Sequence, residues 1–227
     1  MGAIAMRSLN VGMPRVVPFQ RKDVNTGIFK DPTEASLFLS YTNLDGDGQG
    51  DLVHHGGREK AVCVYPYEHY PFWEEALGRQ LSYGALGENV TTQGLLETEV
   101  CIGDTFRLGE AIVEVSQPRQ PCYKLTLRYG VPEMVLKVQQ TGYTGFYFRV
   151  LQEGLVSRDA GISLLERHQT GITIAYANRM MHQDKDDLEG ARRILAVAEL
   201  SDNWRRTFMK RLAGSEPDTR ERLTGQT

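Results

Sequence analysis

Short apolar runs separated by glycine, proline, asparagine and aspartate dominate the chain up to about residue 168. Runs of this kind, rich in β-branched and aromatic residues and bounded by turn residues, are typical of β-strands. The segments that fit best are residues 61–66, 97–103, 105–109, 111–116 and 146–151. Many short strands joined by glycine turns predict a closed or nearly closed β-barrel. We therefore expect a mainly β domain over residues 1–168.

Helical spacing of apolar residues interrupts this pattern twice. Residues 66–77 carry aromatic residues on one helical face, although Pro71 limits where that helix begins. Residues 131–141 have Pro132 near the first helical position and repeat apolar residues after it. The barrel is therefore expected to include a few helices.

After residue 170 the strand pattern disappears. Amphipathic segments at residues 172–182, 187–198 and 201–212 predict three short helices. Helices of this length are unstable alone in water, so they must pack on one another or on the barrel. We expect a small three-helix domain over residues 169–213.

An apolar stripe marks the last of these helices. Ser201 is a favourable N-cap, and Trp204, Phe208 and Leu212 follow at helical spacing. The stripe must be buried against the other helices, the barrel or another subunit, which leaves a homodimer open. The polar residues 214–227 are expected to be disordered.

The composition of the 227 residues is that of an ordinary globular protein, with 41% hydrophobic and 24% charged residues. The net charge of −3 provides no general attraction to nucleic acid or to an anionic membrane surface. No run approaches the ~18 consecutive apolar residues of a membrane span. We expect no nucleic-acid partner and no membrane partner. The acidic residues 184–187 also disfavour a DNA-binding helix-turn-helix in the tail.

The three cysteines are Cys63, Cys101 and Cys122. An odd number without a CxxC pair argues against a disulfide framework and a structural zinc site, and favours a reducing cytoplasm. Cys63 and Cys101 lie in apolar runs and are expected to be buried. Cys122 lies between Arg119 and Lys124, and nearby positive charge favours a thiolate. A thiolate is either a nucleophile or a soft metal ligand.

Prolines stiffen the segment around Cys122, which reads "QPRQPCYKL" over residues 117–125. Pro118 and Pro121 fix their own φ angles and push the preceding residue toward extended geometry. This predicts a rigid, extended loop after the strand at 111–116, rather than a central strand or a helix interior.

Two glycine-rich segments are candidates for ligand binding. Residues 45–57 resemble a calcium loop at first, but its twelfth position is Gly56, which argues against calcium. His54 and His55 point to opposite sides if the chain is extended. The run from His55 to Arg58 combines a titratable ring, two glycines and a cation, which suits an anionic ligand. Residues 84–95 form a second polar loop, which carries the amide of Asn89.

Five segments, in this order, resemble the MOSC-domain family, and in particular its YiiM-like branch. They read "DLVHHGGREKAVCVYPYEHY", "GALGENVTTQGLLE", "CIGDTFRLG", "VSQPRQPCYKL" and "TGYTGFYFRVLQEG". The resemblance covers about residues 5–168, and the helical tail is similar to the three-helix domain of that branch. It implies a MOSC-type β-barrel that binds the molybdenum cofactor, a molybdopterin.

The resemblance also implies site residues. The conserved cysteine of the family falls on Cys122, which would be the catalytic residue and the molybdenum ligand. The residues that match family positions near the cofactor are His55, Arg58, Asn89, Gln117 and Arg119.

The activity that the resemblance implies is the reduction of small N-hydroxylated compounds, such as N-hydroxylaminopurines. Electrons would come from a flavodoxin- or ferredoxin-like partner, attracted by charges expected to stay in water at Arg205, Arg206, Lys210 and Arg211. The alternative is a carrier or sulfur-transfer module that binds the cofactor without turnover.

Overall fold

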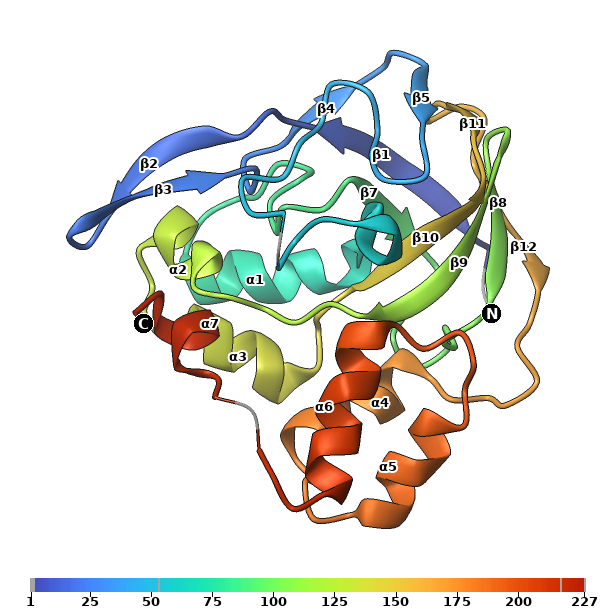
Figure 1. Ribbon diagram of the computed structural model, residues 1–227. Helices are drawn as coiled ribbons and strands as arrows, with labels where there is room; N and C mark the ends of the chain where they lie inside the picture. The colour runs from blue at the N-terminus through green and yellow to red at the C-terminus, as the bar shows by residue number, and fades with distance from the viewer. Residues whose placement is uncertain (1–2, 53, 217, 227) are drawn as a thin grey trace.

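The computed structural model describes residues 3–52, 54–216 and 218–226. Eight strands form its main sheet: β1 (Ala5–Val11), β4 (Asp31–Thr33), β6 (Val62–Pro66), β7 (Val90–Gln93), β8 (Thr105–Leu108), β9 (Ala111–Pro118), β10 (Phe146–Gln152) and β12 (Ile162–Glu166). Their order across the sheet is β12-β8-β9-β10-β6-β7-β1-β4 (Figure 1). The described pairs are antiparallel except that of β6 with β7.

The sheet curls until strands from its two ends meet. β1 contacts β12, although six positions separate them in the sheet order. Two short pairs form separate two-stranded sheets: β2 (Arg15–Phe19) with β3 (Lys22–Thr26), and β5 (Leu37–Leu39) with β11 (Gly154–Val156). The interior is filled by fully buried apolar side chains such as Leu9, Val64 and Phe146. The expected mainly β barrel is confirmed.

Four of the five expected strands are present. Residues 61–66, 105–109, 111–116 and 146–151 correspond to β6, β8, β9 and β10. The expectation for residues 97–103 was wrong, because these residues form turns and one isolated bridge from Cys101 to Thr173. Val100 and Ile102 are nevertheless fully buried, so their apolar pattern reflects burial and not strand pairing.

Strands also form where none was expected. β1 to β5 lie in the first 40 residues, and β7 lies inside the segment 84–95 that was interpreted as a polar loop. Thr91 and Thr92 are buried in β7. Polar β-branched residues of this kind fit a pleated sheet, but they give no apolar signal in the sequence.

Three helices lie beside the barrel (Figure 1): α1 (Tyr70–Leu77), α2 (Lys124–Tyr129) and α3 (Met134–Thr141). The short 3₁₀ helix η2 (Tyr67–His69) leads into α1, and Pro71 lies in its first turn, where a missing N–H costs no hydrogen bond. Tyr65, Trp73 and Leu125 belong to one apolar cluster that joins these helices to the sheet.

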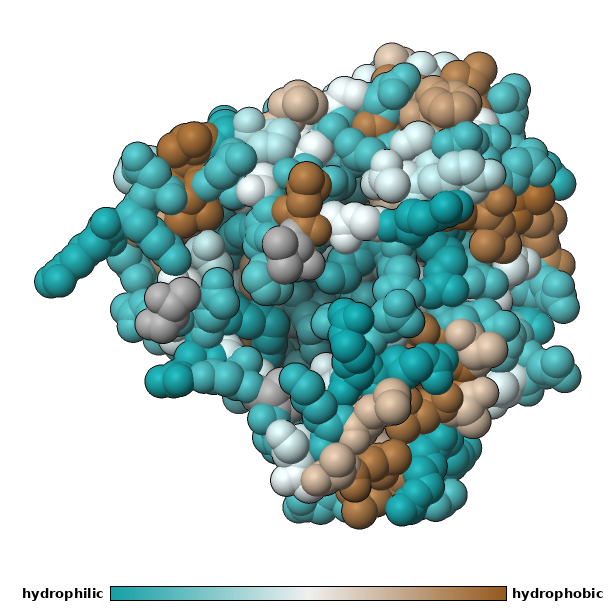
Figure 2. All heavy atoms as spheres, viewed as in Figure 1, coloured by the Kyte–Doolittle hydropathy of each residue, from teal (hydrophilic) through white to brown (hydrophobic). Residues whose placement is uncertain are grey.

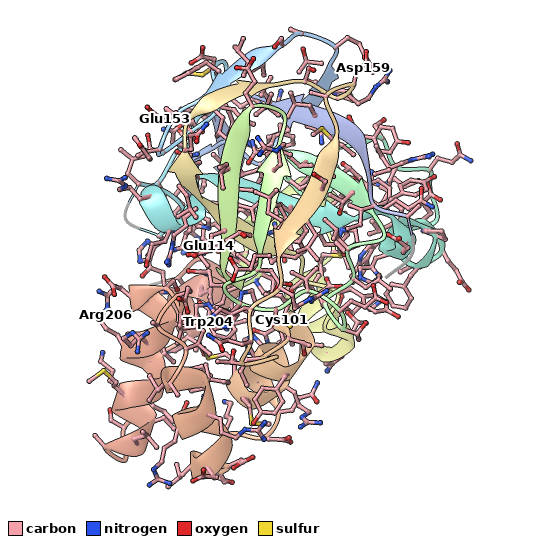
Figure 3. The ribbon with its side chains drawn as sticks, turned by 90° about the vertical axis from the view of Figure 1, so that its right-hand side faces the viewer. Cys101, Glu114, Glu153, Asp159, Trp204 and Arg206 are labelled. Atoms are coloured by element: carbon pink, nitrogen blue, oxygen red, sulfur yellow. The ribbon has the colours of Figure 1, made fainter. Side chains whose placement is uncertain are left out.

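The predicted three-helix domain is present as α4 (Ile174–His182), α5 (Leu188–Leu195) and α6 (Asp202–Leu212). Ser201 is the N-cap of α6, and its side chain accepts a hydrogen bond from the Trp204 amide. Trp204 and Phe208 are fully buried in an apolar cluster that continues into the barrel. Trp204 lies where the domain meets the barrel (Figure 3). The stripe is therefore covered within the chain.

The C-terminal residues differ from the expected disorder. Residues 220–224 form helix α7 (Arg220–Thr224), which lies beside the start of α2 (Figure 1). Its Arg222 side chain donates a hydrogen bond to the Pro121 carbonyl, 101 residues away. The polar sequence of the tail predicted disorder because contacts with distant segments, which hold the helix in place, leave no local signal. No helix in the described parts of the chain is long and apolar enough to span a membrane.

Two of the basic residues expected in water are instead bound within the chain. Arg205 donates to the carbonyls of Leu195 and Val197. Arg211 is only 6% exposed and is hydrogen-bonded within the three-helix domain. The predicted docking surface for an electron donor is reduced to Arg206 and Lys210, and it remains a prediction.

Candidate functional site

Cys122 follows a strand that is longer than expected. β9 continues through Gln117 to Pro118, which pairs with Phe146 of β10. β8 pairs with β9 only as far as Glu114. The missing N–H of Pro118 therefore costs no hydrogen bond to β8. Residues 119–122 are then irregular, and α2 begins at residue 124. The rigid loop is thus shorter than predicted, and Cys122 stands between a strand and a helix.

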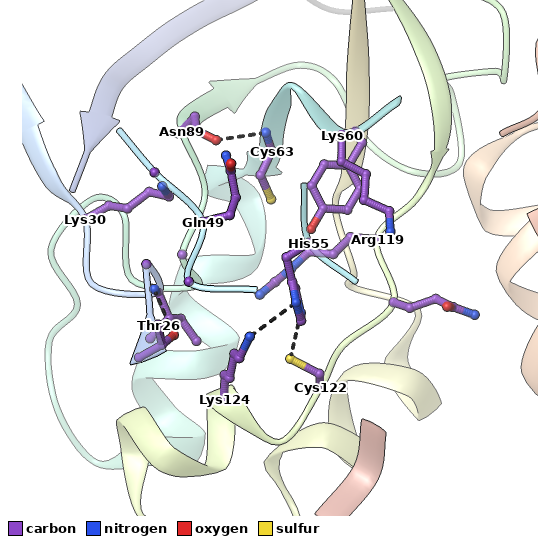
Figure 4. A pocket seen from close by; sticks show the side chains of 17 residues that line it. Thr26, Lys30, Gln49, His55, Lys60, Cys63, Asn89, Arg119, Cys122 and Lys124 are labelled. Carbon is purple, nitrogen blue, oxygen red and sulfur yellow. Dashed lines mark hydrogen bonds between the residues drawn. The ribbon is translucent and has the colours of Figure 1, made fainter. Parts of the chain in front are cut away.

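The thiol of Cys122 faces the ring of His55 (Figure 4). The His55 Nε2 atom lies 3.3 Å from Cys122 Sγ, within hydrogen-bonding distance for sulfur. On the other side of the ring, His55 Nδ1 lies 3.2 Å from Lys124 Nζ and 3.4 Å from Asp51 Oδ2. A carboxylate, a lysine, a histidine and a cysteine therefore form one chain of contacts.

The charges in this chain of contacts favour the thiolate of Cys122. Burial raises the pKa of the thiol, but the positive charge and hydrogen bond of His55, together with Lys124, outweigh it and lower the pKa to about 6. Burial lowers the pKa of His55, yet the thiolate and the hydrogen bond to Asp51 raise it overall. With a pKa of about 6, Cys122 is mostly a thiolate at neutral pH.

The other two cysteines are in the opposite situation. Burial raises the pKa of Cys63 to about 11, and burial also raises the pKa of Cys101. Both are therefore thiols at neutral pH, as expected from the apolar runs that contain them. Cys122 is the cysteine that is suited to act as a nucleophile or a metal ligand.

A small cavity of about 70 Å³ adjoins the thiol (Figure 4). Its lining carries four cationic side chains, Lys30, Lys60, Arg119 and Lys124. Arg119 is 7% exposed, and its Nη2 atom donates to the Leu86 carbonyl at 2.6 Å. Its Nη1 atom is buried and has no hydrogen-bond partner among the described residues. A buried guanidinium with an unused donor is suited to an anionic ligand.

Glycines allow the backbone segments around this cavity to approach closely. A Cβ atom on Gly27 would lie 2.1 Å from the Gly48 carbonyl oxygen, and one on Gly50 would lie 2.3 Å from the Asn25 carbonyl oxygen. No other residue fits at these positions without moving the backbone. The glycine-rich run at 45–57 is thus used for close packing next to the cavity.

A larger cavity of about 660 Å³ continues from the small one. Both cavities share His55, Lys60, Gln120, Cys122 and Tyr147. The larger cavity is also lined by residues of α3, α4, α6 and α7, so it lies between the barrel and the C-terminal helices. Figure 2 shows this face hollowed near its centre, with mostly hydrophilic residues around the hollow. Cys122 therefore stands where a cationic cavity meets a roomier one.

Two family models match the chain. The MOSC domain matches residues 51–163, and the YiiM-like, 3-alpha helix domain matches residues 172–214. The Bacillus subtilis protein YflK is 58% identical over 204 residues, which cover 90% of this chain and 92% of YflK. The chain belongs to the YiiM-like branch of the MOSC-domain family.

Further comparisons agree with this membership. The crystal structure of YiiM from Geobacillus stearothermophilus is 39% identical and matches with a TM-score of 0.80, covering 92% of this chain and 100% of that one. A protein from Gibberella moniliformis named reductase is 37% identical over 149 residues. That match covers 64% of this chain and only 26% of the Gibberella protein.

The residues that the MOSC resemblance assigned to the cofactor lie around both cavities, in different roles. His55 and Arg119 line the small cavity with Cys122. Arg58 and Gln117 line the larger cavity. The Arg58 guanidinium lies over the Tyr41 ring, 4.4 Å from its centre. The Gln117 side chain donates to the Pro118 carbonyl, and its Oε1 atom is buried without a partner in the described structure.

Asn89 lines the small cavity, but its amide is already bonded. Its Oδ1 atom accepts from the Cys63 amide at 3.0 Å, and its Nδ2 atom donates to Asp47 Oδ2 at 2.8 Å. Asp47 also forms a buried ion pair with Lys30. These contacts connect the two glycine-rich segments to β6, so Asn89 supports the cavity wall. They also show that Asp47 serves in packing within the run that resembled a calcium loop.

Several residues of the site were not predicted. Asp51 and Lys60 flank the His55 run, so their positions next to it were a usable signal. Tyr147 lies within the quoted segment at residues 141–154 but was not singled out there. Lys30 lies outside all five quoted segments, and only the fold brings it to the small cavity. Across the described residues there is no group of three or more histidine, cysteine, aspartate or glutamate side chains that could hold a metal ion.

Proposed function

We propose that the protein binds a molybdenum cofactor of the molybdopterin type and reduces N-hydroxylated compounds such as N-hydroxylaminopurines. Electrons would come from a flavodoxin- or ferredoxin-like partner. The observation that carries the proposal is the Cys122 thiolate, which stands where the cationic cavity and the larger cavity meet. Membership of the MOSC-domain family and the relative named reductase support the same class of activity.

The residues present fit such a cofactor. The free Nη1 donor of Arg119, with Lys30 and Lys60 nearby, suits the anionic phosphate of a pterin cofactor. The Cys122 thiolate is a soft donor that suits molybdenum. Histidine and carboxylate groups alone would not favour molybdenum over other metals. A bound cofactor would supply the electron-transfer chemistry, and the protein supplies binding and electrostatics.

The chain's own residues prepare this site. His55 keeps Cys122 in the thiolate state through the contact at 3.3 Å, and Asp51 fixes the orientation of the His55 ring. Cys122 is only 7% exposed, so water has little access to its sulfur. Reduction of an N-hydroxyl group consumes two electrons and two protons and releases water. His55 Nε2 can hold one proton at this position.

The larger cavity gives a small substrate access to the site. Its volume of about 660 Å³ falls within the range of small-molecule sites. It reaches Cys122 from the side of the three-helix domain, whereas the cationic cavity lies on the barrel side. We therefore propose that the anionic part of the cofactor occupies the small cavity and that the substrate enters through the larger one.

The proposal is tested by expression in a host that makes the cofactor. We expect elemental analysis to find about one molybdenum per chain. The reduced holoprotein should be reoxidised by an N-hydroxylated compound and should release the corresponding amine. Cys122→Ser should remain folded and lose this reoxidation, because a hydroxyl is a hard, mostly protonated donor. Cys101→Ser is the matched control, since Cys101 lines neither cavity.

Two results would contradict parts of the proposal. Full reoxidation of Cys122→Ser by the substrate would remove Cys122 as the metal ligand. A wild-type protein that retains molybdenum but is never reoxidised by N-hydroxylated compounds would contradict the reductase activity. That second result would instead favour a carrier or sulfur-transfer module.

A further inference from the structure

The C-terminal segment is bonded to the backbone on both sides of Cys122. The Arg222 guanidinium donates through Nη1 to the Pro121 carbonyl at 2.7 Å. The Arg222 carbonyl accepts from the Tyr123 amide at 2.8 Å. We infer that Arg222 is a positioning residue, which fixes the loop so that Cys122 Sγ faces His55. Its importance for catalysis rests on the proposed role of Cys122, whereas the positioning itself does not.

The loop has few other backbone restraints at this point. On the strand side, the Arg119 amide donates to the Gly145 carbonyl at 3.0 Å. On the helix side, the Leu125 amide donates to the Cys122 carbonyl at 3.0 Å. Pro121 has no N–H to donate. Between these two anchors, the contacts with Arg222 satisfy one acceptor and one donor that would otherwise depend on water.

Helix α7 is also held at its end by the β2–β3 hairpin. The Lys22 ammonium donates to the Gly225 carbonyl. The Tyr123 ring stacks on Phe19 with the ring centres 5.6 Å apart. A Cβ atom on Gly225 would lie 2.8 Å from the same ring, and Gly225 has a φ of 75° that also favours glycine. Tyr123 thus contacts both the hairpin and the C-terminal segment.

The charge of Arg222 is directed to the site and not to an acidic partner. Among the described residues Arg222 forms no ion pair, although acidic residues are present on the same segment at Asp218 and Glu221. Burial lowers its pKa, and the nearby Cys122 charge opposes that effect. Its neighbour Arg220 is fully exposed and pairs with Asp218 instead. Two arginines on one short helix therefore differ in exposure and in partner.

The test compares three variants of the full-length, cofactor-free protein: Arg222→Ala, Arg222→Lys and the control Arg220→Ala. The reaction rate of each cysteine with N-ethylmaleimide is followed by mass spectrometry of its peptide. The measurement is made at about pH 8, well above the wild-type Cys122 pKa of about 6, and is repeated at about pH 9 so that a change in ionisation is separated from a change in access. Cys63 and Cys101 are internal references for general unfolding, because both are buried.

We expect Arg222→Ala to accelerate modification of Cys122 about tenfold, because the loop loses a hydrogen bond from a charged donor and opens more often. Modification of Cys63 and Cys101 should not change. Arg222→Lys should restore the rate to within about threefold of wild type, since an ammonium can still donate to the Pro121 carbonyl. Arg220→Ala should behave as wild type.

The inference is overturned if N-ethylmaleimide modifies Cys122 at the same rate in Arg222→Ala and in Arg220→Ala. It is also overturned if all three cysteines accelerate together, because Arg222 would then support global stability only. In the molybdenum-loaded protein, Arg222→Ala should lower kcat more than it changes KM. If wild type shows no molybdenum-dependent activity, the proposed function fails, and the alkylation comparison still decides the role of Arg222.

Discussion

Two buried arginines, one in the three-helix domain and one at the candidate site, differ in how completely their guanidinium groups are hydrogen-bonded. Arg211, 6% exposed, donates from Nε, Nη1 and Nη2 to Glu216, Met180 and Met181. Arg119 is about equally buried at 7%; its Nη2 atom donates to the Leu86 carbonyl, but its Nη1 atom has no partner in the described structure. Because buried polar groups are normally paired, the complete set indicates packing and the incomplete set indicates a ligand position.

The surroundings of the two arginines support this distinction. Arg211 lies over the Phe208 ring, 5.3 Å from its centre, in a domain with an apolar interior. In the cavity beside Arg119, Lys30 is paired with the buried Asp47 and Lys60 donates to the His54 carbonyl, whereas Nη1 of Arg119 is left without a partner among the described residues. The two arginines therefore differ in whether a buried donor is left over for a ligand.

The largest expected effect concerns Arg211. Arg211→Met should lower the free energy of unfolding by about 3 kcal/mol, because two buried carbonyls lose their donors. Chemical denaturation of the cofactor-free protein measures this. Molybdenum content at a temperature where the variant is folded should match wild type. A loss below 1 kcal/mol, on the order of an exposed pair, would contradict the packing role.

Arg119→Met should show the opposite result. Removing an incompletely paired buried charge should change the free energy of unfolding by less than about 1 kcal/mol. Retention of molybdenum after gel filtration should fall about tenfold, because the anionic ligand loses a buried cation. Arg119→Lys should retain more metal than Arg119→Met. Equal molybdenum in wild type and Arg119→Met would show that the free donor does not mark a ligand site.

The charges near the small cavity should also control the reactivity of Cys122. A thiolate forms above its pKa, so alkylation of wild-type Cys122 should rise through about pH 6 and level off above it. His55→Ala should shift this midpoint upward by about one pH unit, because the positive neighbour is lost. His54→Ala is the matched control, since that ring contacts Asp51 and is largely exposed. An unchanged midpoint in His55→Ala would exclude the pairing.

The smallest expected effect tests a helix cap in the three-helix domain. Ser201→Ala removes the acceptor of the Trp204 amide and should lower the free energy of unfolding by about 1 kcal/mol. Molybdenum content should not change. Ser215→Ala, at an exposed position after α6, should alter neither quantity and serves as the control. If Ser201→Ala lost the metal, the two regions would not be separable in this way.

The helices after residue 170 were predictable because their signals are local. The spacing of Trp204 and Phe208 and the Ser201 cap lie within one helix, and a 3.6-residue period requires no knowledge of distant partners. The strand at β7 was not predictable, because buried threonines in a polar context resemble a loop. The strand predicted at residues 97–103 was wrong for the converse reason, since an apolar pattern does not distinguish a strand from a buried turn.

For the site, the sequence by itself determined its central residues. The order of the glycine-rich and proline-rich motifs indicated Cys122, His55 and Arg119, and the charges beside Cys122 indicated a thiolate. These conclusions depend on neighbours along the chain and on the resemblance to a family. The sequence also determined that the last domain is helical.

Only the tertiary structure decided how these residues work together. Lys124 meets His55 across 69 residues, and Arg222 meets Pro121 across 101 residues. It also decided that Asn89 supports the cavity wall and that Arg205 and Arg211 are bound within the chain. Such contacts join segments that share no local period or motif, so their existence follows from the packing of the barrel, its helices and the C-terminal segment.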